Sequence, residues 1–199
     1  MSVVNTNKAK LSDVSAGGHV SGRDTIVTEH HYHSTSRAVA VREDKTLKIL
    51  IEEHEQAILT DCDYREFSET LNNFLNRKIS PDLRDLTTKL TEGDRSHLVM
   101  LAMMLKEDVT KKIMKHSHFE SAQKIYTHLL RTVYSTYLTE IYSKVKSAHF
   151  PMHEIDEQIL ERIVTPILDN VGDCSLLIDK NEVYGLLYIL TGNCYIEWK

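Results

Sequence analysis

The feature that most constrains the fold is the spacing of apolar residues from residue 44 to about residue 190. Large apolar side chains recur there at intervals of three and four positions, which places them on one face of an α-helix. The longest such face comprises Phe119, Ala122, Ile125, Tyr126, Leu129, Leu130, Val133, Tyr137, Leu138, Ile141, Tyr142 and Val145. We therefore predict an all-α domain over residues 44–199, a single bundle of about seven helices.

Short polar side chains predict where several of these helices begin. Asp44 can cap a helix over the residues that follow it. Ser80 precedes Pro81, and proline suits the first helical position because an N–H there would have no partner in the helix. Ser117 and Glu120 have the spacing of a capping box at the start of the longest helix. We therefore expect helices to start at these three places.

Breaks in the pattern predict how the later helices end. Pro166 lies inside a helical pattern, where its ring and its missing N–H should kink or end the helix. Gly172 is a candidate stop for the same segment. Asp179 or Asn181 is expected to cap a last helix that reaches about Leu190.

The C-terminal residues carry further signals. Gly185 sits inside an apolar helix, where glycine is unfavourable, and this indicates close packing of another helix. Gly192 and Asn193 suit a left-handed helix cap. The stretch "CYIEW", Cys194–Trp198, alternates in polarity and predicts a short β tail. Trp198 can pack against the bundle or anchor a partner.

The longest apolar run of the chain is "HLVMLAMML", His97–Leu105. It is apolar nearly all round a helix that begins at Asp94 or Ser96, so we expect the start of this helix to be buried. The run is far shorter than the roughly 20 residues that span a bilayer, as is "VYGLLYIL", Val183–Leu190.

Residues 1–43 differ from the rest, with few large apolar side chains and many Ser, Thr, Val, Gly and His. Gly17, Gly18 and Gly22 lie within six residues, and "VSAGG" is nearly repeated by "VSGRD". Short β-branched pieces separated by glycines can form a β-arc or hairpin, which gains stability by joining a sheet edge or another copy. We therefore interpret residues 1–43 as an N-terminal arm, either β-forming and able to self-associate, or a disordered tail.

The composition argues against several functional classes. The formal net charge of −5 gives no general attraction to nucleic acid. Cys62, Cys174 and Cys194 are far apart and odd in number, which is typical of reduced thiols in a cytosol rather than of a disulfide framework. No basic segment leads into an apolar run as in a signal peptide. We therefore expect a cytoplasmic protein.

The sequence offers no strong catalytic motif. The glycine segment lacks the Lys-Ser/Thr of a phosphate loop, and no G-x-S-x-G elbow is present. His19, His30, His31 and His33 lack the paired cysteine ligands typical of a structural zinc site. We therefore predict a protein that is not an enzyme and has no cofactor and no metal. An enzyme that uses these histidines or Cys194 is the weakest hypothesis.

Two segments resemble parts of known proteins. "AGGHVSGRDTI", Ala16–Ile26, resembles a segment found near the junction of effector and helical domains in bacterial conflict systems. "VYGLLYILTGNCYIEW", Val183–Trp198, resembles the end of a C-terminal helical domain of the ABC-three-component antiphage systems, the group that includes Lamassu. The resemblance implies an accessory or effector-coupling domain that docks on an SMC-like ABC ATPase. Only 43 residues precede the helices, which implies a stand-alone subunit or an effector on a separate chain.

On this basis we expect a non-catalytic interaction subunit of an antiphage defence complex, assembled partly through its N-terminal arm. The candidate partner-binding residues are Gly17, Gly18, Val20, Gly22, Arg23, Asp24, Ile26, Tyr195 and Trp198. The alternative is a small DNA-binding regulator, in which the histidines of the arm and Arg23, Arg37 and Arg42 would contact phosphate.

Overall fold

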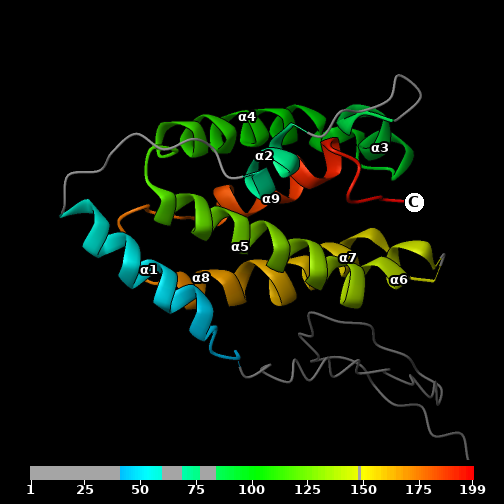
Figure 1. Ribbon diagram of the computed structural model, residues 1–199. Coiled ribbons are helices and arrows are strands. Elements are labelled where there is room, and N and C mark those ends of the chain that lie inside the picture. The colour runs from blue at the N-terminus through cyan, green and yellow to red at the C-terminus, as the bar shows by residue number, and fades with distance from the viewer. Residues whose placement is uncertain (1–40, 60–68, 77–83, 148) are drawn as a thin grey trace, which may run out of the picture. The chain divides into compact units, whose positions relative to one another are not determined.

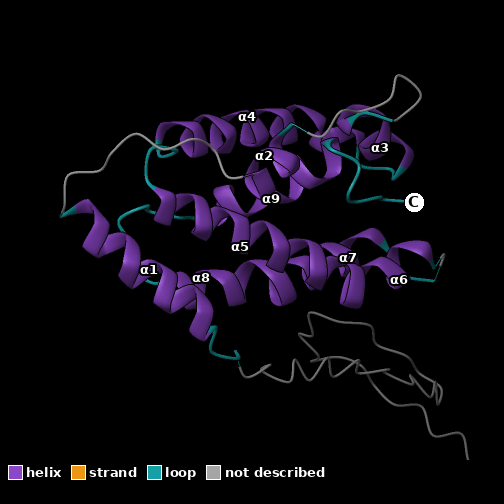
Figure 2. Ribbon diagram, viewed as in Figure 1, coloured by secondary structure: helices purple, strands orange, loops and turns teal. Residues whose placement is uncertain are grey.

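The computed structural model describes residues 41–59, 69–76, 84–147 and 149–199. All of them belong to one compact unit, Ala40–Lys199. The regular structure in these ranges is helical, without a strand (Figure 2). The predicted all-α fold is therefore confirmed.

The helices follow one another along the chain as shown in Figure 1. They are α1 (Lys45–Ile58), α2 (Glu69–Leu75), α3 (Leu86–Glu92), α4 (Val99–Lys115), α5 (Glu120–Thr136), α6 (Tyr142–Lys146), α7 (Met152–Ile159), α8 (Thr165–Val171) and α9 (Lys180–Gly192). A 3₁₀ turn, Ser96–Leu98, leads into α4. A π turn at Tyr137–Ile141 joins α5 to α6, and another at Leu160–Val164 joins α7 to α8. Because the π turns make α5 and α6 one continuous helix and α7 and α8 another, the described residues form seven separate helices. This is the number that the spacing predicts.

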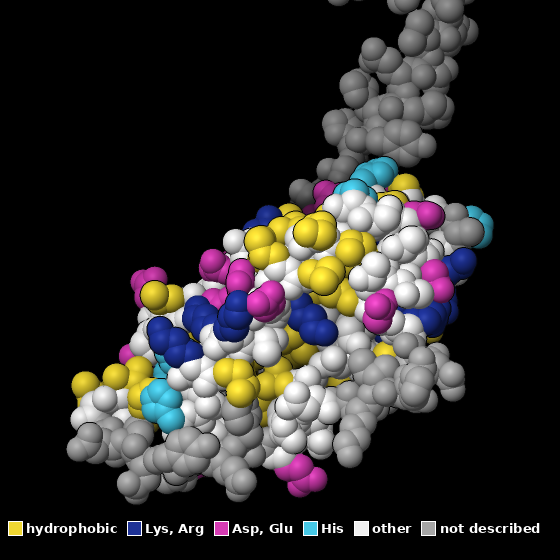
Figure 3. Space-filling model, turned by 90° about the horizontal axis from the view of Figure 1, so that it is seen from above, with side chains coloured by type: hydrophobic (Ala, Val, Ile, Leu, Met, Phe, Trp, Pro, Cys, Tyr) yellow, Lys and Arg dark blue, Asp and Glu magenta, His cyan; other side chains and the backbone are white. Residues whose placement is uncertain are grey.

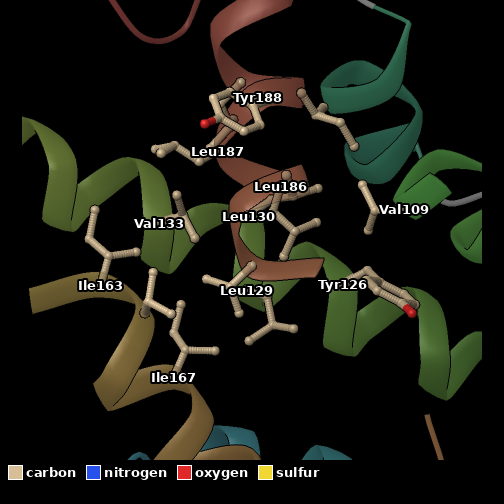
Figure 4. Packing of buried hydrophobic residues seen from close by; sticks show 14 of the residues in the cluster. Val109, Tyr126, Leu129, Leu130, Val133, Ile163, Ile167, Leu186, Leu187 and Tyr188 are labelled. Atoms are coloured by element: carbon tan, nitrogen blue, oxygen red, sulfur yellow. The ribbon is translucent and has the colours of Figure 1, made fainter. Parts of the chain in front are cut away.

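Helix α9 lies at the centre of the core, and it is buried on nearly every side. Its residues from Gly185 to Gly192 are all buried. In Figure 4, Leu186 of α9 lies near Leu130 of α5. The other side of α9 packs against α4 and α3. Because α4 lies directly against Gly185, the predicted close helix packing at this glycine is confirmed.

Several predicted helix ends are confirmed. The Asp44 side chain accepts a hydrogen bond from the Leu47 N–H at 3.0 Å and caps α1. Asp179 and Glu182 form a capping box at the start of α9. Gly172, with a φ of +56°, ends α8.

The predicted capping box at Ser117 is wrong. The cap of α5 is Phe119, which makes no side-chain capping bond. The Ser117 hydroxyl instead donates to the Met114 carbonyl oxygen, at the end of the preceding helix. A serine between two helices can bond either to a free N–H of the following helix or to a free carbonyl oxygen of the preceding one. The sequence pattern does not show which of these bonds forms.

The helix that contains Pro166 does not end there but continues to Val171. A π turn, Leu160–Val164, lies just before the proline. Such a turn changes the hydrogen-bond register next to a residue whose ring and missing N–H would disrupt a regular α-helix. The predicted start at Ser80 and Pro81 lies outside the described residues, and within them α3 begins at Leu86 with Asp85 as its cap.

The C-terminal segment is not the β tail that its alternation suggests. Ile196 and Trp198 are buried and Glu197 between them is half-buried, so the alternation does describe burial. However, the N–H groups of Tyr195 and Ile196 donate to the Leu190 carbonyl oxygen, and the described chain gives the segment no strand to pair with. The left-handed backbone conformation expected at Gly192 or Asn193 occurs instead at Cys194, whose φ is +61°.

Candidate partner-docking surface

The outward side of α4 is apolar and exposed. Met100 is 79% exposed, Leu101 43%, and Met103 and Met104 51% each. We call these four residues the α4 apolar face. Seen from the side of α4, apolar side chains gather on this surface of the molecule (Figure 3). Large contiguous apolar patches on soluble proteins mark interaction sites.

This exposure corrects the expectation that the start of α4 is buried. The buried residues of α4 all lie on one side, and they are Ala102, Leu105, Val109 and Ile113. That side packs against α9, whereas no described element covers the opposite one. Methionine is a good helix former with a flexible, polarisable side chain, and it is common at adaptable binding surfaces.

A first hollow of about 330 Å³ lies beside the α4 apolar face, between α4, α7 and α9. Its apolar lining residues are Leu98, Leu101, Leu105, Ile159, Leu187 and Trp198. Its polar lining residues are Arg95, Asp156, Lys180, Asn181, Tyr184 and Tyr188. Burial is the main cause that raises the pKa of Tyr188, to about 12, so its hydroxyl stays protonated at neutral pH.

Arg95 is fixed at the wall of this hollow and is only 3% exposed. Its guanidinium lies 4.6 Å from the centre of the Trp198 ring, a cation–π contact. One terminal nitrogen donates to Asp156 Oδ1 at 2.8 Å and the other to the Gly93 carbonyl oxygen at 3.1 Å. Its buried Nε has no hydrogen-bond partner among the described residues. These contacts hold Arg95 and Asp156 rigidly at the surface of the hollow.

A second hollow of about 310 Å³ lies further along α4. Its lining residues are Met104, Leu105, Asp108, Val109, Lys112, Leu177, Asp179, Asn181 and Glu182. Leu105 and Asn181 line both hollows, so the two adjoin. Leu177 is 78% exposed and continues the apolar surface beyond α4.

An ion pair is part of the lining of the second hollow. Lys112 Nζ lies 2.5 Å from Glu182 Oε2, and the Tyr126 hydroxyl donates to Glu182 Oε1 at 3.1 Å. Burial raises the pKa of Glu182, and the hydrogen bond and charge of Lys112 offset part of that rise. Burial also raises the pKa of Tyr126. These groups join α4, α5 and α9, which is a structural role.

The two predicted site residues within the described chain have internal contacts. Trp198 is 5% exposed, and its Nε1 donates to the Thr191 hydroxyl at 3.1 Å. The Tyr195 hydroxyl donates to the Asn73 carbonyl oxygen at 3.3 Å. Trp198 therefore packs the terminus onto the bundle, while it also lines the first hollow. A role in partner binding stays a prediction for both.

The remaining candidates and the metal question concern the arm. The candidate residues outside the described ranges are Gly17, Gly18, Val20, Gly22, Arg23, Asp24 and Ile26. Arg37 and the histidines of the arm lie there too, whereas the backbone carbonyl of Arg42 accepts a hydrogen bond from Asn170. Among the described residues, no three His, Cys, Asp or Glu side chains are placed to hold a metal ion.

No described helix is long and apolar enough to cross a membrane.

Sequence reasoning missed the α4 apolar face, although its signal is present. The run "HLVMLAMML" contains Met100, Met103 and Met104, and a helix that is apolar all round exposes whatever side its neighbours leave uncovered. Arg95 and Lys180 gave no signal in the sequence. They come together with Leu101 only because α4, α7 and α9 pack side by side.

Comparison with known proteins identifies the family of this chain. Residues 85–198 match the family model of C-terminal domain 9 (CTD9) of the ABC-three component (ABC-3C) systems. The match covers more than half of the chain and includes every residue that lines the two hollows. No curated protein and no solved structure matches the chain.

Proposed function

Because the chain belongs to the C-terminal domain 9 family of the ABC-3C systems, we propose that it is a non-catalytic interaction subunit of such a system. It docks on a partner through the α4 apolar face. The observation that carries this proposal is the exposure of Met100, Leu101, Met103 and Met104 within the matched region. Such a patch is costly in water unless a partner covers it.

The proposed partners are the SMC-like ABC ATPase and the separate effector of a cytoplasmic antiphage complex, of which the Lamassu group is one example. Membership of a multi-component system supports this choice. The resemblance of Val183–Trp198 to the end of a helical domain in such systems supports it as well. The subunit then connects an ATPase to its effector without performing chemistry of its own.

The chemistry of the described titratable groups supports a non-catalytic role. Burial raises the pKa of the Cys174 thiol, which disfavours the nucleophilic thiolate. Glu182, Lys112 and Tyr126 bond to one another and join three helices. These three side chains therefore have structural partners, although Lys112 and Glu182 also line the second hollow.

The test uses the full-length chain, expressed together with the ABC ATPase and the effector encoded beside it. We expect Met104→Asp to reduce the capture of the partner by the tagged chain at least tenfold, because the new carboxylate would be buried at an apolar interface. Ile49→Asp is the matched control, since Ile49 of α1 is 56% exposed and lies outside both hollows. Equal capture by the two variants would contradict docking through α4.

A further inference from the structure

We propose that the two adjoining hollows form one groove, the α4–α9 groove, which binds an amphipathic helix of the partner subunit. This inference rests on the proposed function and specifies the chemistry of its partner. The helix places two large apolar side chains in the hollows, an acidic residue beside Lys180, and a basic residue beside Asp108.

The groove has the length and the surface that a helix needs. Leu101, Leu105, Asp108 and Lys112 are spaced four, three and four residues apart, so they follow one side of α4. At 1.5 Å per residue, the distance from Leu101 to Lys112 corresponds to roughly 17 Å, about three helical turns. An amphipathic helix that enters such a groove is anchored by apolar side chains one or two turns apart.

The two hollows suit bulky apolar anchors. Each has a volume of about 300 Å³ and is open to solvent beside exposed apolar residues. The walls of the first hollow are leucine, isoleucine and tryptophan side chains, with polar groups at selected places. Binding energy at helix-in-groove interfaces is concentrated in large side chains that fill such pockets.

The charges along the groove differ between its two parts. Arg95 and Lys180 outnumber the single acid of the first hollow, Asp156. In the second hollow Asp108, Asp179 and Glu182 outnumber Lys112. A partner helix of complementary charge is therefore acidic over the first hollow and basic over the second.

Two of these charges have no ion-pair partner in the described part of the chain. Lys180 lies 5.8 Å from the centre of the Tyr184 ring. Glu107 is the main cause that raises the pKa of Lys111, and nearby Asp108 adds slightly to it, but neither Lys180 nor Asp108 forms a close ion pair there. Lys180 is the first residue of α9, where a cation is disfavoured by the helix dipole and a nearby carboxylate is favoured. An acidic residue of the partner beside Lys180 would pair with the lysine charge and would also interact favourably with the dipole of α9. This fixes the direction in which the partner helix lies along α4.

The first test fills the groove. Asn181 is exposed and lines both hollows, so Asn181→Trp places a large ring in the groove without altering the core. We expect the dissociation constant for the co-encoded partner to rise at least tenfold. His153→Trp, at an exposed position of α7 outside both hollows, should leave it unchanged. Wild-type affinity in Asn181→Trp would overturn the groove proposal.

The second test locates the occupant. A photo-crosslinking amino acid replaces Leu101 or Asp108 in the assembled complex, and the linked residues are identified by mass spectrometry. We expect both positions to link to one partner segment, at residues three to seven apart. Lys180→Glu should weaken binding, and changing the acidic residue of the linked segment that lies over the first hollow to a basic one should restore it. Links between two copies of this chain, or to its own residues 1–40, would overturn the proposal.

The outcomes separate this inference from the proposed function. If the complex forms and depends on Met104 but its cross-links from Leu101 and Asp108 reach no helix, the groove proposal fails and docking through α4 stands. If the wild-type chain binds neither the ATPase nor the effector, both proposals fail.

Discussion

Gly185 of α9 lies so close to Leu105 of α4 that a Cβ atom at the glycine would come within 2.6 Å of the Leu105 carbonyl oxygen. The same Cβ would lie 2.7 Å from Val109 Cγ1. The two helices therefore approach each other at a distance that only glycine allows. Because Leu105 lines both hollows, this contact also sets the geometry of the α4–α9 groove.

Gly185→Ala should destabilise the fold. In an isolated helix this change favours folding by about 1 kcal/mol. Here the added methyl group meets backbone and a β-branched side chain, and overpacking of this kind costs about 1–3 kcal/mol. Urea unfolding followed by circular dichroism measures the free energy of unfolding. A variant more stable than the wild type would show that α4 can move away at no cost.

Lys89→Met should also destabilise the fold, because Lys89 is a buried lysine with specific partners. Its Nζ donates to the carbonyl oxygens of Thr191 at 3.0 Å and Ile196 at 3.1 Å, and lies 3.0 Å from a Glu197 carboxylate oxygen. Methionine keeps the volume but removes the Lys89 donor from the buried Ile196 carbonyl oxygen, at about 1–3 kcal/mol, whereas the Thr191 carbonyl oxygen still accepts from the Cys194 N–H. Lys111→Met, which removes an exposed pair with Glu107, is the control and should change stability by less than about 1 kcal/mol. A similar loss in both variants would contradict the role given to Lys89.

The stability of the fold should fall in mild acid because of His54. This buried ring pairs through Nδ1 with the Ser121 hydroxyl at 2.8 Å. Burial lowers the pKa of His54 below its ordinary value of 6.5, so the unfolded chain takes up a proton at a higher pH than the folded one. The stabilising contribution is complete above pH 6.5 and is lost as the pH falls through the folded pKa.

Urea unfolding at several pH values from 7.5 to 5 tests this prediction. His54→Gln should reduce the slope of stability against pH. It should not remove the slope entirely, since burial also lowers the pKa of His116. An unchanged slope in the variant would show that His54 is not responsible.

Trp198→Ala should cost about 3–5 kcal/mol, the usual cost of removing a buried aromatic side chain. Trp198→Phe keeps most of the packing but loses the bond to Thr191, and should cost less. The comparison uses thermal unfolding of the isolated chain. If Trp198→Ala lowers partner binding but leaves the isolated chain as stable as the wild type, then the residue is an anchor for a partner and not a packing residue.

Local signals in the sequence predict the helices well. The spacing of apolar residues reflects the geometry of the helix backbone, which is a local property. The spacing is therefore enough to predict the all-α fold and the long helix that begins at Glu120. Asp44 and Asp179 cap their helices as predicted, because a capping bond joins residues three positions apart. Ser117 was misassigned because it lies between two helix ends and can bond to either.

Features that depend on distant parts of the chain could not be predicted in this way. Whether α4 is covered depends on which helices pack around it, and α9 lies about 80 residues further along the chain. The hollows combine residues from Arg95 to Trp198, and no local pattern shows that these come together. The resemblance at Val183–Trp198 correctly indicated a C-terminal domain of the ABC-three-component systems, but it did not indicate the surface that we propose for docking.

The central claim is that a partner covers the α4 apolar face, and methionine oxidation tests it most directly. Met104 is 51% exposed and Met114, at the other end of α4, is 52% exposed and lines neither hollow. In the free chain, dilute hydrogen peroxide should oxidise both at similar rates, as measured by mass spectrometry. In the assembled complex we expect oxidation of Met100 and Met104 to slow at least tenfold while Met114 reacts as before. Oxidation of Met100 and Met104 in the complex at the rates of the free chain would contradict the claim.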